Sequence, residues 1–320
     1  MERRLTEVDR RQGFSSPDLL VPVKIGILGY GVVGNAIARG FSITSQGQDQ
    51  IIYHDNDYRK IHSKPLPEVI ERSDLVFITL PTPMKEDITA LSENSGIDLS
   101  IIEEAVENLT PYTNGTDKLV VIKSTVIPGT TAKFEKAYPR TNFAFNPEFL
   151  TEKNPLKDFL NASDTFIGAN RDLTLRTLAS FYEQRFPATN IELMSPTTAE
   201  AVKYFRNGFL DLKIAWANIY HEYCEALGIS YPEVKKYGAR DFRIGDYHLD
   251  VHEEDGSRGS DGKCLPKDKV ALIRHMVALG VDPSFVLEQW TYNLKVNKKR
   301  KFQEIPFAVS NGKYGLSKTP

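Results

Sequence analysis

Short apolar runs recur through the first two-thirds of the chain, and each is followed by a longer stretch whose apolar residues have helical spacing. Runs rich in Val, Ile and Phe are typical of strands buried on both faces of a sheet. Strands that alternate with helices predict βαβ units, and therefore an α/β fold with a doubly wound parallel sheet covered on both faces. The predicted strands are residues 24–29, 50–55, 74–80, 118–125, 142–149 and 164–169.

The pattern changes at Ser195-Pro196, after which no strand signal remains. Thr197 and Glu200 have the spacing of a capping box, and the helical pattern that follows runs to Leu227 and ends at Gly228. Further helices are predicted over residues 232–238, 268–279 and 284–303, so the second domain is mainly α-helical. We expect an extension over 1–22, a sheet domain over 23–195, a helical domain over 196–308 and a tail over 309–320.

The composition excludes several classes of partner. The 320 residues are 41% hydrophobic and carry a net charge of −2, which suits two soluble domains and gives no basic surface for nucleic acid or a membrane. No stretch has the roughly 18 uncharged apolar residues of a membrane span. Two cysteines, Cys224 and Cys264, exclude a disulfide framework and indicate a cytoplasmic protein. No metal is expected, because His248 and His252 lack the companion ligands that zinc requires.

A glycine-rich turn follows the first predicted strand and opens a predicted helix. Its sequence, Gly29-Tyr30-Gly31-Val32-Val33-Gly34, has the G-x-G-x-x-G spacing that lets a backbone approach a pyrophosphate at a helix N-terminus. The second strand ends in Asp55, whose carboxylate can accept both hydroxyls of an adenosine ribose and would repel a 2′-phosphate. These features predict a Rossmann-type domain that binds NAD in preference to NADP.

Cys264 is the candidate nucleophile. It precedes a predicted helix start, with Pro266 suited to an early helical position, and a helix N-terminus beside Lys263 and Lys267 would stabilise a thiolate. Cys224 instead falls in the apolar pattern of a long helix, which indicates a buried and unreactive thiol.

At these residues the sequence resembles the UDP-glucose/GDP-mannose 6-dehydrogenase family, whose nucleophile stands in a similar G-G-x-C-x-P-K-D motif. The resemblance covers about residues 24–300, with the motifs in the expected order. The matching segments are the glycine-rich turn, Thr82-Pro83, Ser124-Thr125-Val126 with residues 128–131, residues 146–152, Ala199-Glu200 through Lys203, Asn207, Lys213, and Arg243-Ile244-Gly245.

The resemblance implies an NAD-dependent, four-electron oxidation of a sugar C6 alcohol to a carboxylate through a thiohemiacetal and a thioester on Cys264. It implies that Asp268 and Thr125 position water, that Lys213 and Asn207 stabilise the oxyanion, and that Glu148 transfers protons. The implied cofactor-binding residues are Gly29, Gly31, Val32, Val33, Gly34, Asp55, Lys60, Thr82, Pro83, Thr125 and Glu152. The implied substrate-binding residues are Glu148, Phe149, Leu150, Lys203, Asn207, Arg243 and Gly262, with UDP-glucose the first choice of substrate.

The chemistry supports these implied roles, because a primary alcohol that becomes an acid loses two hydrides and passes through an aldehyde that a thiol can retain. Helix geometry raises one difficulty. On an ideal helix Lys213 and Asn207 lie about 120° apart, so the helix would have to bend for both to line one site.

The sequence departs from the family pattern in three places. The family's C-terminal nucleotide-sugar-binding domain is not expected here, Ser260 and Asp261 replace the usual aromatic residue and glycine, and Lys153 replaces a frequent glycine. A carboxylate at Asp261 could raise the pKa of the thiol or bind a sugar hydroxyl. Two alternatives stay open, a non-catalytic NAD-binding or interaction protein and a two-electron β-hydroxyacid dehydrogenase.

A homodimer is expected. In the resembling family the arginine that matches Arg243 serves the neighbouring subunit's site. The helix predicted over 284–303 carries apolar residues at helical spacing that a symmetric dimer would bury. These residues are Phe285, Val286, Trp290 and Leu294.

Overall fold

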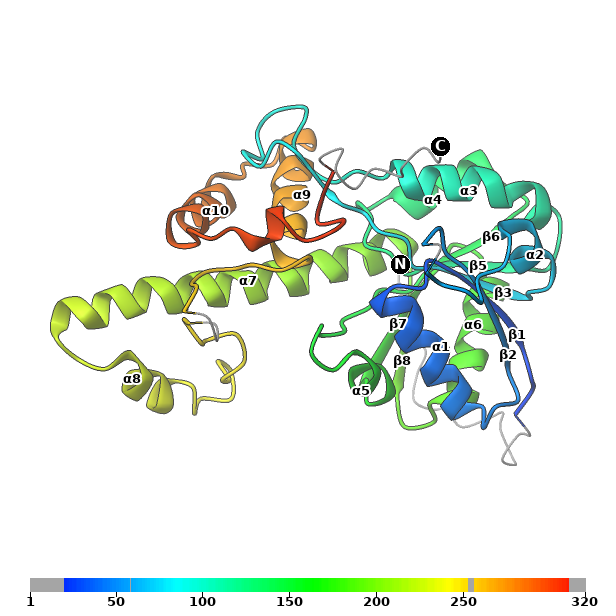
Figure 1. Cartoon of the computed structure of the whole chain (residues 1–320), viewed down its shortest axis with the longest axis horizontal. Coiled ribbons are helices and arrows are strands. Elements are labelled where there is room, and N and C mark those ends of the chain that lie inside the picture. Colours follow the sequence, from blue (N-terminus) through cyan, green and yellow to red (C-terminus); the bar gives the residue numbers. More distant parts are fainter. Residues whose placement is uncertain (1–19, 58, 253–255, 311–320) are drawn as a thin grey trace, which may run out of the picture.

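The computed structural model describes residues 20–57, 59–252 and 256–310. The chain forms a sheet lobe and a helical lobe, and one long helix, α7 (Pro196–Leu227), runs from the first into the second (Figure 1). Of the extension expected over 1–22, residues 1–19 lie outside the described part, as do residues 311–320 of the expected tail. Among the described helices, none is both long and apolar enough to cross a membrane.

The main sheet has seven strands in the order β2-β1-β3-β5-β6-β7-β8. The strands are β1 (Lys24–Leu28), β2 (Gln50–His54), β3 (Leu75–Ile78), β5 (Leu119–Ile122), β6 (Asn142–Phe145), β7 (Asp164–Gly168) and β8 (Asn190–Met194). The first five pair in parallel, as predicted. The doubly wound, mostly parallel sheet that the sequence predicted is present, with one antiparallel junction, where β7 meets β6 through the single pair Phe145↔Gly168.

Strand β8 was not predicted from the sequence. It lies at the edge of the sheet, parallel to β7, and its Glu192 is exposed, so it lacks the continuous apolar run that marks the central strands.

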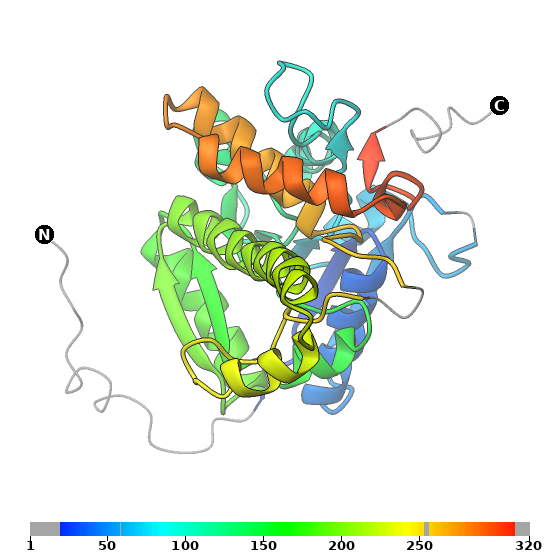
Figure 2. The same cartoon turned by 90° about the vertical axis from the view of Figure 1, so that its left-hand side faces the viewer.

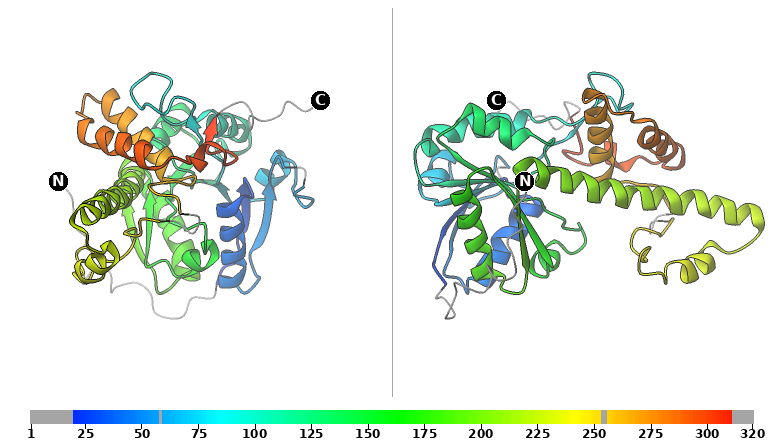
Figure 3. Two further views of the ribbon diagram at one scale, coloured as in Figure 1. Left: turned by 60° about the vertical axis from the view of Figure 1, so that its left-hand side comes forward. Right: turned by 180° about the vertical axis from the view of Figure 1, so that it is seen from behind.

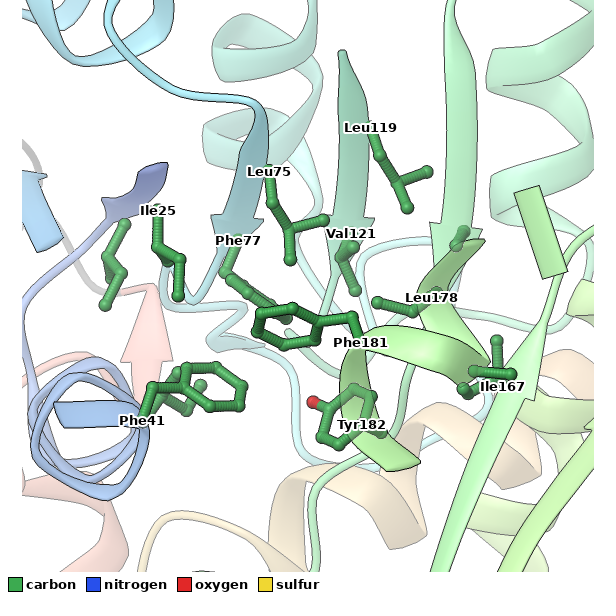
Figure 4. Close-up of a cluster of buried hydrophobic side chains, with 14 of the residues drawn as sticks. Ile25, Phe41, Leu75, Phe77, Leu119, Val121, Ile167, Leu178, Phe181 and Tyr182 are labelled. Atoms are coloured by element: carbon green, nitrogen blue, oxygen red, sulfur yellow. The ribbon is translucent and has the colours of Figure 1, made fainter. Parts of the chain in front are cut away.

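Helices cover both faces of the sheet. They are α1 (Val32–Thr44), α2 (Leu66–Glu71), α3 (Ser100–Thr113), α4 (Thr130–Ala137), α5 (Pro155–Leu160) and α6 (Asp172–Arg185). Alternate residues of each central strand face opposite ways, so Leu75 and Phe77 pack with α1, α5 and α6, whereas Val76 and Ile78 pack with α2, α3 and α4. Figure 4 shows the first of these two cores, where Phe41 of α1 lies among the strand residues and α6.

The helical lobe consists of α7, α8 (Tyr231–Gly238), α9 (Leu265–Ala278) and α10 (Ser284–Val296), followed by the short 3-10 helix η1 (Lys301–Gln303). Viewed along α7, α10 and α8 lie on different sides of it (Figure 2). Helix α9 begins three residues before the predicted 268, so Cys264 is its N-cap residue. Helix α10 ends at Val296 rather than 303, because Asn297 turns its side chain to Ser260 O and Arg300 N.

The start of α7 differs from the predicted capping box. Ser195 is the N-cap, and its Oγ accepts from Thr198 N at 3.1 Å. The carboxylate of Glu200 instead reaches the first turn of α4, where it accepts from Gly129 N at 2.5 Å and Thr131 N at 2.8 Å. Glu200 therefore caps a different helix and ties α7 to the sheet lobe.

Two short strands join the lobes a second time. β4 (Met84–Lys85), after β3, pairs in parallel with β9 (Val309–Ser310), so the expected tail begins within a strand. The two views in Figure 3 show the last described strand, β9, in red beside the helical lobe.

The apolar side of α10 is not free for a partner, contrary to the expectation for helix 284–303. Trp290 is buried beside Phe302, and its Nε1 donates to Ile88 O at 2.8 Å. Val286 and Leu294 pack on the same cluster, which η1, β4 and β9 complete, and only Phe285 of the four expected interface residues stays mostly exposed.

We predict that Glu200→Ala lowers the free energy of unfolding by about 3 kcal/mol, because it leaves two buried N–H groups of α4 without an acceptor. Urea denaturation measures this change. Glu192→Ala, which removes an exposed carboxylate from β8, is the matched control and should stay close to the unmodified protein. Equal losses for the two variants would contradict the anchoring role.

Candidate active site

The glycine-rich turn has the geometry of an anion-binding helix start. Gly29 has a φ of +90°, and a Cβ on Gly34 would lie 2.1 Å from Gly29 O, so both positions require glycine. A Cβ on Gly31 would meet nothing within 4 Å, which leaves the N-terminus of α1 open on that side. The first turn of α1, which Val32 and Val33 begin, holds no acidic residue. A pyrophosphate can therefore approach these backbone N–H groups.

Asp55 lies at the carboxyl end of β2 beside this turn. Its Oδ2 accepts from Tyr30 N at 2.6 Å and its Oδ1 from Asp57 N at 2.8 Å, so the carboxylate is held in place. Tyr30 stacks on Tyr53 at 3.8 Å, and the Lys60 ammonium lies 5.8 Å from the Tyr30 ring centroid. The residues present fit an adenosine ribose on the carboxylate, and the charge of Asp55 opposes a 2′-phosphate.

The remaining residues expected at the cofactor lie near the same edge of the sheet, with one exception. Thr82 is buried just after β3, the Pro83 carbonyl accepts from Asp98 N at 2.8 Å, and Thr125 follows β5. The exception is Glu152, which is exposed and lies in the segment after β6.

The candidate nucleophile lies where α7 crosses α9. Cys264 is the N-cap residue of α9, and Asp268 stands in the first turn of that helix. Asn207 of α7 donates from Nδ2 to Asp268 Oδ2 at 2.6 Å, and Lys267 Nζ donates to the other carboxylate oxygen. The structure thus brings Cys264, Asp268 and Asn207 together, as the sequence indicated.

Lys203, one helical turn before Asn207, carries the ammonium group of this cluster. Its Nζ donates to Glu148 Oε1 at 3.1 Å and to the Glu148 carbonyl, while Glu148 Oε2 accepts from Leu150 N at 2.8 Å. Burial alone would lower the pKa of Lys203, but the carboxylates of Glu148 and Asp268 outweigh burial and raise it. Lys203 is therefore a fully charged group beside Cys264.

The thiol of Cys264 is not the stabilised thiolate that its two neighbouring lysines suggested. Burial raises its pKa to about 11, and the Glu148 carboxylate adds to this effect, while the Lys203 ammonium opposes it. Lys267 turns its ammonium to Asp268, which offsets the charge that would have favoured a thiolate. In this arrangement the sulfur keeps its proton at neutral pH.

Lys213 and Arg243 lie apart from the cluster. Lys213 Nζ donates to the carbonyl oxygens of Ile244 and Gly245 at 3.0 and 3.4 Å, as its angular distance from Asn207 on the helix would suggest. Arg243 pairs with Asp241, two residues away, and its side chain is 75% exposed. The structure does not bring either residue to the sulfur within one chain.

Asp261 was expected to influence the thiol or bind a sugar hydroxyl, but its carboxylate caps η1. Its Oδ1 accepts from Phe302 N at 2.7 Å and its Oδ2 from Lys301 N at 3.2 Å. Ser260 is buried, and its backbone is held by Asn293. Gly262 follows with a φ of +79°, which turns the chain into Cys264.

A cavity of about 630 Å³ adjoins the cluster, and sequence reasoning missed two of the cations that line it. Lys123, at the end of β5, is buried and donates to Asn146 Oδ1 at 2.6 Å; burial lowers its pKa to about 7. Arg206 lies on α7 between Lys203 and Asn207. Lys123 could have been predicted as a site residue, because a lysine directly after a buried strand is unusual. The sequence around Arg206 gave no such indication, because an arginine on a helix is usually a surface residue.

We predict that iodoacetamide alkylation of Cys264, followed by mass spectrometry in a Cys224→Ala background, speeds up about tenfold per pH unit between pH 7 and 9, because the rate follows the thiolate fraction. Glu148→Gln removes a carboxylate that raises the thiol pKa, so this variant should react faster at each pH. Glu152→Gln changes an exposed carboxylate and serves as the control. A rate that reaches its plateau near neutral pH would show that the thiol is already ionised.

The chain is similar to known proteins over both lobes. Residues 62–186 match the NAD-binding domain of the UDP-glucose/GDP-mannose dehydrogenase family, and residues 197–297 match its central domain. The chain is 30% identical over 300 residues to UDP-glucose 6-dehydrogenase AglM of Haloferax volcanii, covering 82% of this chain and 67% of that protein. It is 34% identical over 229 residues to UDP-glucose 6-dehydrogenase of Rickettsia typhi, covering 68% and 46%.

A solved structure shares the fold as well. The UDP-glucose dehydrogenase of the hyperthermophilic archaeon Pyrobaculum islandicum superposes with a TM-score of 0.73 at 26% identity, covering 89% of this chain and 70% of that one. Since two of the family's domains match in order over most of the described residues, the chain belongs to the UDP-glucose/GDP-mannose dehydrogenase family.

Proposed function

We propose that the chain oxidises the C6 alcohol of a nucleotide sugar to a carboxylate with NAD, and that UDP-glucose is the substrate. The observation that carries the proposal is the cluster at the crossing of α7 and α9, where a thiol, an ammonium, an amide and two carboxylates converge. Both relatives compared above are named UDP-glucose 6-dehydrogenases, which supports this sugar nucleotide over others in the family.

The first half of the proposed reaction makes an aldehyde. NAD, held by the glycine-rich turn and Asp55, would supply the hydride acceptor, and two NAD molecules bound in turn would be needed for the two oxidations. As the alcohol loses its hydride, negative charge develops on its oxygen, and the Lys203 ammonium and the Asn207 amide stabilise that charge in a site shielded from water. Glu148, bonded to Lys203, is placed to take up the alcohol proton. Lys203 thereby takes the role that the sequence resemblance implied for Lys213.

The second half uses Cys264. Its sulfur adds to the aldehyde carbon, forming a C–S bond, while the thiol proton passes to the former carbonyl oxygen; no proton is gained or lost overall. Glu148, once it has released the first proton to solvent, takes the hydroxyl proton of this thiohemiacetal, and loss of a second hydride gives a thioester. Water, oriented by Asp268 and Thr125, then breaks the C–S bond, releasing the carboxylic acid and restoring the thiol. The covalent bond prevents the aldehyde from escaping between the two oxidations.

The yield of NADH per acid tests the reaction class. We expect two NADH for each UDP-glucuronate formed, measured by absorbance together with chromatography of the product. One NADH per product would indicate a two-electron dehydrogenase, and no NADH with any sugar nucleotide would favour a non-catalytic protein.

Variants of the same assay test the roles of the residues. Cys264→Ala should form no acid while still binding NAD, and Lys203→Met should lower kcat by about 10²–10³-fold because an oxyanion donor is lost. Lys213→Met is the matched control, since its ammonium binds backbone carbonyls outside the cluster. If Lys213→Met loses the chemical step and Lys203→Met keeps it, the assignment is reversed.

The protein is further proposed to work as a homodimer, through α7 rather than α10. A row of large apolar side chains on α7 is exposed and falls within about 40° on an ideal helix, on the side opposite Asn207. Its members are Phe205, Phe209, Trp216, Tyr223 and Leu227. A row spaced by four and seven residues suits pairing with the same helix of a second copy, because a two-fold axis sets identical faces together.

Sedimentation and subunit mixing test this assembly. Trp216→Glu should convert a dimer into a monomer. Arg243→Glu and Cys264→Ala chains, each inactive alone, should regain activity when mixed, because hybrid dimers hold one site with an intact cysteine and an intact partner arginine. Mixed dimers that form without activity would show that Arg243 does not serve the neighbouring site.

A further inference from the structure

Arg206 occupies a corner between two aromatic rings. Its guanidinium carbon lies 4.5 Å from the centroid of Phe149 and 4.7 Å from that of Phe166. The two rings are 6.0 Å apart and inclined at 78°, so the planar cation packs against two differently oriented faces. Such cation–π contacts hold a guanidinium without using its N–H donors.

The donors of Arg206 have no partner within the described part of the chain. The carboxylates that line the same cavity form their hydrogen bonds and ion pairs with other residues, although the Ser163 hydroxyl and, to a smaller extent, the charge of Arg206 lower the pKa of Asp164. Asp158 accepts from Thr151 N at 2.8 Å, Asp164 accepts from Ser163 Oγ at 2.7 Å, and Glu148 binds Lys203. Arg206 is therefore an oriented, half-buried cation whose five N–H groups are available to a ligand in the cavity.

The position of Arg206 on α7 relates it to the reacting carbon. Lys203 precedes it by three residues, which places the two side-chain origins about 5–6 Å apart on neighbouring parts of the helix surface. Phe149 joins them, because the Lys203 ammonium lies 5.1 Å from the same ring. In a hexopyranose, C6 is bonded to C5 and the anomeric oxygen to C1, and these two ring carbons lie on either side of the ring oxygen. A sugar with C6 at Lys203 can thus place its anomeric phosphate at Arg206.

We propose that Arg206 binds the diphosphate of the nucleotide-sugar substrate, and that Phe149 and Phe166 orient its guanidinium for that contact. The inference rests on the proposed function for the identity of the ligand. A guanidinium fork matches two phosphate oxygens at once, so the contact fixes both the charge and the orientation of the substrate. Arg206 binds substrate and takes no part in the chemical step.

Calorimetric titration with UDP and with UDP-glucose, without cofactor, tests the contact directly. Arg206→Met should bind both ligands at least tenfold more weakly than the unmodified chain, and Arg206→Lys, which keeps the charge but loses the fork, should lie between them. Arg240→Met is the matched control, because Arg240 also packs on an aromatic ring, 5.0 Å from the centroid of Tyr237, but lies on the segment after α8. NAD affinity should be the same in all four proteins.

Steady-state kinetics provide a second measurement. Arg206→Met should raise KM for UDP-glucose by the same factor while kcat stays close to that of the unmodified chain, and the rise of KM with added salt should become shallower. Unchanged UDP affinity in Arg206→Met, or no binding of UDP by the unmodified chain, would overturn the proposal.

The binding result does not depend on turnover. If the unmodified chain binds UDP-glucose but forms no NADH, the proposed function fails, while the comparison of variants still decides the role of Arg206. If acid forms normally and Arg206→Met binds UDP as well as the unmodified chain, the function stands and the diphosphate contact is wrong.

Discussion

The contact between Glu200 and the first turn of α4 sets where α7 leaves the sheet lobe, and the candidate site depends on that direction. Lys203 and Asn207 stand three and seven residues beyond this anchor, about 5 and 10 Å along the helix axis. Because Glu200 is buried and lies close to both residues, its contact fixes the positions of Lys203 and Asn207 relative to the sheet. The same carboxylate satisfies the helix start that follows β5, so the two sides of the site share one fixed point.

The antiparallel junction between β6 and β7 lies beside the cavity that adjoins the cluster. Where β6 meets β7 through a single residue pair, Asn146 bridges the seam: its backbone N–H binds Ile122 O at 2.9 Å and its Nδ2 binds Phe166 O at 2.7 Å. The chain leaves this seam as residues 147–151, which carry Glu148 and Phe149 to α7. Residues from both sides of this junction, Asn146 after β6 and Thr165 of β7 among them, line the cavity.

Sequence patterns predicted what depends on periodicity and on local motifs. The two-residue alternation of the central strands, the glycine-rich turn, and the grouping of Cys264, Asp268 and Asn207 all appear in the structure. The choice between two lysines could also have been made, since Lys203 and Asn207 are four residues apart and share a helix face, whereas Lys213 does not. Two properties have no sequence signature: the direction of β7, and the burial of Cys264, which raises the pKa of its thiol.

The pairing of β4 with β9 closes a loop of about 225 residues, the separation of Met84 and Val309. The entropic cost of closing a loop grows only slowly with its length, so a long loop does not prevent this pairing. The pairing cannot form, however, until the chain has been synthesised to residue 310. The parallel strands β1, β2, β3, β5 and β6 of the main sheet need no residue beyond Phe145. During synthesis, therefore, the nucleotide-binding sheet can fold first, and the cluster around Trp290 is completed last, when the final strand arrives.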